Sequence, residues 1–275
     1  MHQRIGHRQA LGTRLGTRLR KAAAVLVRAS STSSSCGIAS CSLCGSSEDA
    51  SAPRSQRASV SSLGLDRPAK VEFNGPVYGR KIWENVASVS ECQIAAQATR
   101  SAMLIASDSD GAGRLFPPDA PSAASYLGAQ GFEVINTLRA RVDEHIAAQY
   151  GAVERVGCLL SWTSGRGELG TPDDEPLQAF NWLRDAVKGT YAPHIDAENQ
   201  PAYELSTLLY LSTAGADFSG GLFAFNDVDA DRLVVPHAGR LLAFCSGHRN
   251  LHQVRPVRAG DRFVLSTWYR RAVGC

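Results

Sequence analysis

The chain of 275 residues contains no apolar run of the roughly 18 residues that a transmembrane helix needs. It also lacks a strong charge imbalance, because its formal net charge of +3 is too small to indicate a nucleic-acid-binding protein. No internal repeat is visible. The 44% of hydrophobic residues suffice for one good-sized core plus an appendage, or for two small domains.

Acidic residues are missing from the first 47 positions, which carry seven Lys and Arg residues. Aromatic residues are absent from Ala29 to Leu63, where Ser and other small residues dominate. Such sequence cannot bury enough apolar surface to offset its ordering entropy, so we expect residues 1–68 to be a disordered leader. An Arg-rich, Ser-rich, acid-free start is typical of a mitochondrial or plastid transit peptide. A secretory or anchoring segment and a plain tail of a cytoplasmic protein remain alternatives.

The seven cysteines do not complete a metal site. Cys41 and Cys44 form a CxxC, and Cys36 lies close by, but no second CxxC and no nearby histidine accompanies them. The number of cysteines is odd, and nothing in their spacing requires an oxidising compartment. We therefore expect solvated thiols in the leader.

Two amphipathic helices are predicted in the first half of the remaining chain, residues 69–275. Ser88 and Glu91 form a capping-box pattern that begins a helix extending to about Ile105. A second helix is expected over 132–150, and Gly151 is typical of its C-terminal end. Its core-facing stripe consists of Val134, Leu138, Val142 and Ile146.

A loop is expected between the two helices at 111–121. After Gly151 the pattern changes to short β-strands separated by turn residues. Helices precede these strands and do not alternate with them, so a Rossmann arrangement is disfavoured. We expect an α+β domain with support helices over 84–150 and a sandwich or barrel-like β core over about 156–272. The expected strands are 71–73, 156–162, 203–211, 222–225, 233–235, 240–244 and 263–268.

The residues with the clearest chemistry are His194 and Asp196, which are separated by one residue. In a strand, positions i and i+2 point to the same face, so one segment can offer an imidazole and a carboxylate to one metal ion. A third ligand must come from elsewhere, and His252 is well placed for this role. Two histidines and one carboxylate on one side of a metal are typical of non-haem Fe(II) oxygenases, which keep the other positions open.

Arg262 follows His252 by ten residues and begins a strand pattern. If Arg262 points inward, it is a costly buried cation unless an anion pairs with it. The distal carboxylate of 2-oxoglutarate is such an anion and suits bidentate pairing with a guanidinium. His237 and His248 are rival ligands, but their turn and loop contexts favour exposed positions.

The segment from about 190 to 270 resembles the catalytic domain of the prolyl 4-hydroxylase-like Fe(II)/2-oxoglutarate dioxygenases. The resemblance covers roughly the last third of the chain, and the N-terminal helices match the family's support helices only loosely. The matching pieces are YAPHID at 191–196, LLYLS at 208–212, DFSGG at 217–221, VPHAGR at 235–240 and SGHRNLH at 246–252, followed by the stretch through Arg262.

This resemblance implies a double-stranded β-helix core of the jelly-roll, cupin-like kind. It implies that His194, Asp196 and His252 bind Fe(II) and form the catalytic centre, and that Arg262 binds the C5 carboxylate of 2-oxoglutarate. Collagen-type members have Lys where this chain has Arg262. Tyr210 and Tyr191 fall where relatives place tyrosines around the cosubstrate or the metal.

The activity implied by the resemblance is hydroxylation of a peptidyl proline or a related side chain. It consumes 2-oxoglutarate and O₂, releases succinate and CO₂, and carries a family expectation of ascorbate dependence. Its substrate is a protein or peptide and not a nucleic acid. A jelly-roll binding module without turnover and a zinc hydrolase with the same ligands are the alternatives, although neither explains Arg262 at its spacing.

Overall fold

The computed structural model describes residues 69–70, 79–106, 113–166 and 193–272. The leader at 1–68, the expected strand at 71–73 and Tyr191 lie outside the described residues. Between the first two, Ala69–Lys70 is described and forms a two-residue strand. No helix within these ranges is long and apolar enough for a membrane span.

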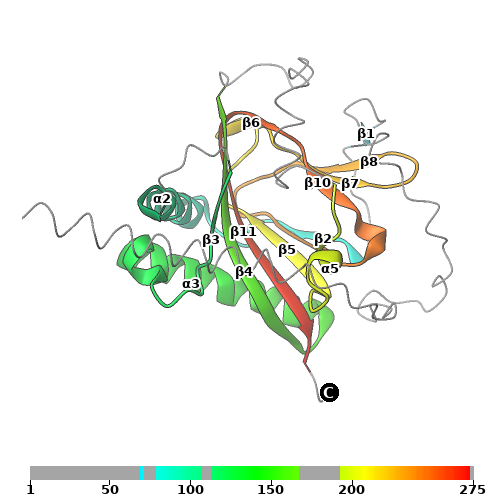
Figure 1. Ribbon diagram of the computed structural model, residues 1–275, viewed down its shortest axis with the longest axis horizontal. Coiled ribbons are helices and arrows are strands. Elements are labelled where there is room, and N and C mark those ends of the chain that lie inside the picture. Colours follow the sequence, from blue (N-terminus) through cyan, green and yellow to red (C-terminus); the bar gives the residue numbers. More distant parts are fainter. Residues whose placement is uncertain (1–68, 71–78, 107–112, 167–192, 273–275) are drawn as a thin grey trace, which may run out of the picture.

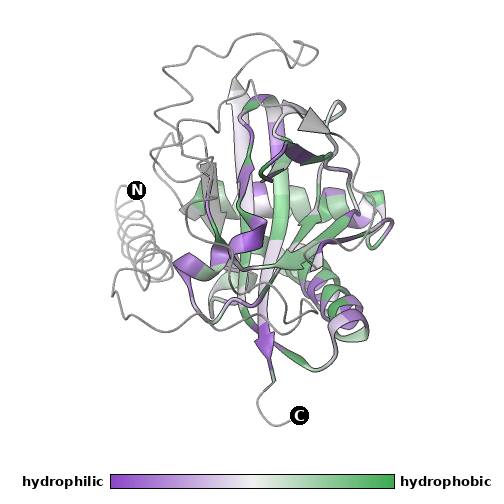
Figure 2. Cartoon of the chain, turned by 90° about the vertical axis from the view of Figure 1, so that its right-hand side faces the viewer, coloured by the Kyte–Doolittle hydropathy of each residue, from purple (hydrophilic) through white to green (hydrophobic). Residues whose placement is uncertain are grey.

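Two helices cover one face of the larger of two sheets (Figure 1). Helix α2 spans Val89–Ala106, and helix α3 spans Ala123–Tyr150. The predicted C-terminal end of α3 is confirmed, because Gly151 has φ +83° and its N–H bonds to the carbonyl of Ala147. Helix α3 begins earlier than predicted and contains a non-helical residue at Gly128. Figure 2 shows hydrophobic and hydrophilic residues alternating along a helix, as expected for a helix that covers a sheet.

The predicted capping box of α2 is confirmed. The backbone N–H of Ser88 donates to the Glu91 carboxylate at 2.8 Å, and the N–H of Glu91 donates to Ser88 Oγ at 3.2 Å. Arg141 of α3 pairs with the same carboxylate at 2.9 Å. The hydrogen bonds from Arg141 and from Ser88 lower the pKa of Glu91 from its ordinary 4.5 to about 2.

We expect Ser88→Ala to lower the free energy of unfolding by about 1 kcal/mol, the usual cost of losing an N-cap. Because folding lowers the pKa of Glu91, its contribution is present above about pH 4.5 and is lost as the pH falls toward 2. Urea unfolding at pH 7 and at acidic pH measures both effects. Ser101→Ala, at an exposed position inside α2, is the matched control and should not destabilise the protein, because Ala has a higher helix propensity than Ser. A neutral Ser88→Ala would contradict the cap.

The strands of the described ranges form two facing sheets whose order and pairing, antiparallel except between β1 and β8, make a double-stranded β-helix (Figure 1). The larger sheet has the order β2-β9-β5-β11-β4-β3, with β6 paired to β11, and the smaller has the order β1-β8-β7-β10. The strands are β1 Ala69–Lys70, β2 Lys81–Trp83, β3 Gly113–Phe116, β4 Val153–Arg166, β5 Leu205–Tyr210, β6 Phe218–Gly220, β7 Phe223–Asn226, β8 Asp231–Val234, β9 Leu241–Cys245, β10 His252–Val254 and β11 Val257–Arg271.

The two faces of β11 belong to different cores. Phe263 and Leu265 pack in the cluster that contains the helices. Val264 packs between the two sheets, in a second cluster that includes Phe223 of β7 and Phe244 of β9. Because side chains alternate along a strand, Arg262 and Trp268 lie on the same face as Val264, toward the smaller sheet. The side chains of Arg262 and Trp268 therefore lie on the face of β11 that points into the space between the two sheets.

The expected loop at 111–121 is partly wrong, because Gly113–Phe116 forms β3 and pairs with the edge of β4. Strand β2, at Lys81–Trp83, likewise joins the larger sheet through β9. Both strands are too short to show an alternating pattern, and their conformation depends on pairing with β4 and β9. The region before Gly151 is therefore not purely helical.

Candidate metal centre and cosubstrate pocket

His194, Asp196 and His252 lie together in the structure. His194 and His252 are paired by two backbone hydrogen bonds, with N–O distances of 2.9 and 3.0 Å. The expectation that Asp196 shares a strand with His194 is wrong, because Asp196 begins the short helix α5, Asp196–Asn199. The backbone turns there because the N–H of Gln200 bonds to the Asp196 carbonyl. The carboxylate still faces both imidazoles.

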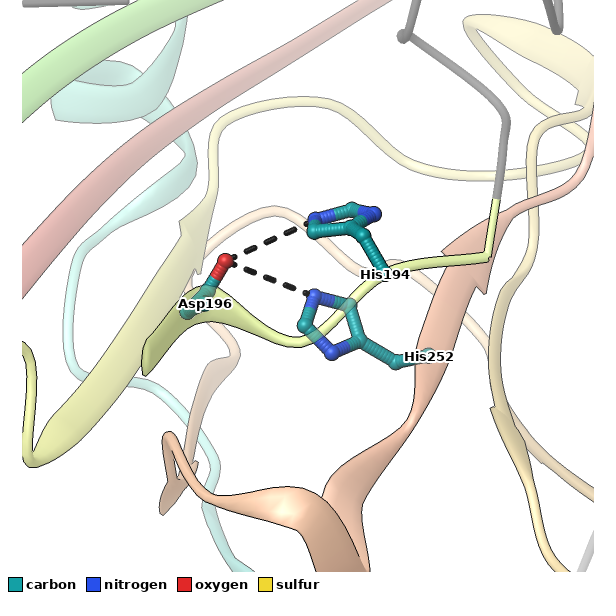
Figure 3. Close-up of side chains that lie close together, drawn as sticks. All are labelled: His194, Asp196 and His252. Atoms are coloured by element: carbon teal, nitrogen blue, oxygen red, sulfur yellow. Dashed lines mark ion pairs between the residues drawn. The ribbon is translucent and has the colours of Figure 1, made fainter. Parts of the chain in front are cut away.

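The ligand atoms of the three side chains surround one point. Asp196 Oδ1 lies 3.5 Å from His194 Nε2 and 3.8 Å from His252 Nε2 (Figure 3). One potential ligand atom from each residue lies within 4.8 Å of the others. No other group of three such residues occurs within the ranges that the structure describes. Two nitrogens and one carboxylate oxygen suit a divalent transition metal.

The surroundings of His252 fix its ring and keep it neutral. His252 Nδ1 donates to the backbone carbonyl of Asn250 at 2.9 Å, so Nε2 carries the lone pair toward Asp196. The rings of Phe223 and Phe244 lie 5.1 and 4.9 Å from the imidazole. Burial, followed by the charge of His194, lowers the pKa of His252 to about 4. A neutral imidazole is the form that binds metals.

Asp196 is buried but ionised. Burial raises its pKa, but the opposing effects of His252, His194 and a hydrogen bond from Ser206 hold the pKa below its ordinary value. Ser206 Oγ donates to Asp196 Oδ2 at 2.6 Å, and Trp268 Nε1 donates to the same oxygen at 3.1 Å. The three side chains thus offer two neutral donors and one anionic donor.

Arg262 and Tyr210 lie between the two sheets. Arg262 is 4% exposed and Tyr210 is fully buried, and the guanidinium carbon lies 5.6 Å from the centroid of the Tyr210 ring. Burial raises the pKa of Tyr210, against the opposing effects of Arg262 and Arg240. Thr163 of β4 is the direct cross-strand partner of Arg262. This buried cation with a phenol and a hydroxyl beside it suits a carboxylate.

Residues 180–270 match the model of the 2OG-Fe(II) oxygenase superfamily. This segment of the chain is similar to the 2OG-Fe(II) oxygenase domain. This confirms the family resemblance of the motifs, and 2OG-Fe(II) oxygenases use Fe(II), 2-oxoglutarate and O₂.

The chain matches only part of the length of its curated relatives. The chain is 45% identical over 74 residues to the 2-oxoglutarate and iron-dependent oxygenase domain-containing protein 3 of Xenopus tropicalis, covering 27% of this chain and 23% of that protein. It is 37% identical over 112 residues to human prolyl 3-hydroxylase 2, covering 38% and 15%. The motifs quoted above also resemble the first of these types. The chain therefore spans less than a quarter of these relatives.

Among solved structures, a prolyl hydroxylase from Trichoplax adhaerens, in complex with a peptide fragment of the hypoxia inducible factor oxygen degradation domain, is similar to the chain. The sequence identity is 20% and the TM-score is 0.46, over 70% of this chain and 84% of that one.

The rival histidines do not join the group formed by His194, Asp196 and His252. His237 is exposed. His248 is also exposed and lies 3.5 Å from the carboxylate of Glu198. Both positions agree with the expectation from their turn and loop contexts.

Arg80 supports the site from far away in the sequence, and the motifs gave no signal of it. Its Nε donates to Asn250 Oδ1 at 2.7 Å, and its guanidinium pairs with Asp227 at 2.6 and 2.9 Å. The Asn250 amide in turn donates to the Cys245 carbonyl at 2.7 Å. Because the carbonyl of Asn250 accepts the His252 ring N–H, Arg80 helps to fix the turn that orients that imidazole.

Proposed function

We propose that this protein is an Fe(II)- and 2-oxoglutarate-dependent dioxygenase that hydroxylates a peptidyl proline or a related side chain. The observation that carries the proposal is the convergence of His194, Asp196 and His252 within a domain of the matching superfamily. The donor set fits Fe(II), because two imidazoles and one carboxylate on one side leave positions for a cosubstrate and O₂.

In this proposal the chain holds and orients, and the metal supplies the redox chemistry. His194, Asp196 and His252 bind Fe(II), which when bound supports O₂ reduction coupled to decarboxylation of 2-oxoglutarate and hydroxylation of a C–H bond. In this proposal Arg262 binds the C5 carboxylate and the Tyr210 hydroxyl donates to it, which the packing of the Tyr210 ring beside the guanidinium supports. Phe223 and Phe244 exclude water from the buried side of the centre.

The substrate class is supported by the similarity to prolyl 3-hydroxylase 2 of chicken, rat, mouse and human. The Arg at position 262 separates the chain from collagen-type members, which have Lys there. Ascorbate is proposed as an aid to sustained turnover.

The proposal is tested with the purified full-length chain, loaded anaerobically with Fe(II). Adding 2-oxoglutarate should produce a weak visible charge-transfer band, and admitting O₂ should release succinate. Proline-containing peptides should stimulate succinate release and gain one oxygen atom, measured by mass spectrometry. Tight zinc retention with no band would favour the hydrolase alternative. A band without succinate, with or without peptides, would favour the binding module.

A further inference from the structure

One oxygen of the Asp196 carboxylate is already used by the protein. Oδ2 accepts hydrogen bonds from Ser206 Oγ at 2.6 Å and from Trp268 Nε1 at 3.1 Å. Oδ1 is the atom that faces His194 Nε2 and His252 Nε2. The two oxygens of one carboxylate therefore have different surroundings.

The positions of the two donors are fixed by the pairing of β5 with β11. Ser206 of β5 and Trp268 of β11 are direct cross-strand partners, so their side chains leave the same face of the larger sheet side by side. Ser206 Oγ also lies 2.7 Å from Ser246 Oγ, which follows β9. The Ser246 carbonyl accepts the N–H of Ala197. Three adjacent strands thus hold the start of α5.

The indole of Trp268 is fixed from both sides. Its ring stacks on Tyr203 with centroids 4.9 Å apart and an interplanar angle of 11°. Gly157 of β4 is the cross-strand neighbour of Trp268, and a Cβ there would lie 3.1 Å from the indole and 3.0 Å from the Tyr203 hydroxyl. The absence of a side chain at Gly157 therefore lets the indole approach Asp196.

We propose that Trp268 and Ser206 are positioning residues that occupy Asp196 Oδ2 and leave Oδ1 alone for the metal. This inference rests on the proposed function. It assigns to two residues the control over how many oxygens of Asp196 bind the metal. A carboxylate bound through both oxygens would take a position that the cosubstrate or O₂ needs. Hydrogen bonds to the second oxygen exclude that mode and orient the first.

The test measures metal binding and not turnover. Mn(II) affinity of the full-length protein is measured for Trp268→Phe, Ser206→Ala and the double variant. Because loss of a supporting hydrogen bond typically costs about 10–100-fold in affinity, we expect about tenfold for each single variant and more for the double variant. Trp268→Phe keeps an aromatic ring against Tyr203, so its main change is the lost donor.

The infrared difference spectrum between metal-free and Mn(II)-loaded protein gives a second readout. The separation of the two carboxylate stretching bands is larger for one-oxygen than for two-oxygen binding. We expect the wild type to show the larger separation and the double variant to show a smaller one. A merely structural role for the pair would change the unfolding midpoint and leave this separation unchanged.

Two controls separate positioning from general destabilisation. Trp83→Phe changes an indole on β2, and Ser88→Ala removes the helix cap, and both should leave Mn(II) affinity unchanged. If the wild type binds Mn(II) and the double variant matches it in affinity and in band separation, the positioning role is overturned. If the wild type itself binds neither Mn(II) nor Fe(II), the proposed function fails, and the inference fails with it.

Discussion

Asp196→Ala is expected to abolish succinate formation and to remove most of the affinity for Fe(II). Asp196 supplies the anionic donor of the proposed site, and His252 beside it is kept neutral by burial. The loss should exceed the roughly 10–100-fold that loss of a supporting hydrogen bond costs, because a ligand itself is removed. Succinate release and Fe(II) binding by the full-length variant measure the effect.

The substitution also removes the acceptor of the half-buried Trp268 Nε1, while the buried Ser206 Oγ keeps Ser246 Oγ as a partner, so folding should lose about 1–3 kcal/mol in all. Unfolding in urea must therefore show that the variant is still folded at the assay temperature. Glu198→Ala is the matched control, because it removes an exposed carboxylate from the same short helix and should keep full turnover. Undiminished turnover by Asp196→Ala would remove Asp196 from the proposed ligands.

The parts of the fold and the site that were predictable depend on local patterns. The capping box of α2 involves neighbouring residues, and the alternation of Arg262 and Val264 with Phe263 and Leu265 assigns the faces of β11 without knowledge of its partners. The convergence of His194 with His252 was expected because the residue types suit one metal. Their direct backbone pairing, however, depends on a contact between distant segments.

The parts that were not predictable depend on pairing between distant segments. Ser206 and Trp268 become neighbours only through the register of β5 with β11. Arg80 contacts Asn250 across 170 positions of sequence, and an isolated arginine gives no signal of such a partner. Helix α5 was not predicted, because four residues are too few to show a helical period. The orientation of Asp196 is therefore determined by its hydrogen bonds and not by a strand, as had been expected.

Arg262→Ala is expected to raise the 2-oxoglutarate concentration needed for half-maximal turnover by about 10–100-fold, because a charge-assisted hydrogen bond is worth about 1.5–3 kcal/mol. Fe(II) affinity should stay close to that of the wild type, which separates this variant from Asp196→Ala. The 2-oxoglutarate requirement of Arg262→Lys should fall between those of the wild type and Arg262→Ala, because Lys keeps the charge and lacks the planar guanidinium that pairs with a carboxylate. Arg270→Ala is the control on the same strand, because its ion pair with Glu154 is at the surface, with a side chain 43% exposed.

A second cosubstrate makes the assignment of Arg262 specific. A short 2-oxo acid without the C5 carboxylate, such as 2-oxobutyrate, keeps the groups that meet the metal and lacks the group that Arg262 is proposed to bind. The wild type should strongly prefer 2-oxoglutarate over this analogue, and Arg262→Ala should lose most of that preference, as a double-mutant cycle requires for interacting partners. If the preference survives in Arg262→Ala, the distal carboxylate is bound by another residue. If the variant weakens both acids equally, Arg262 acts through the packing between the two sheets, where it is 4% exposed, and not through the anion.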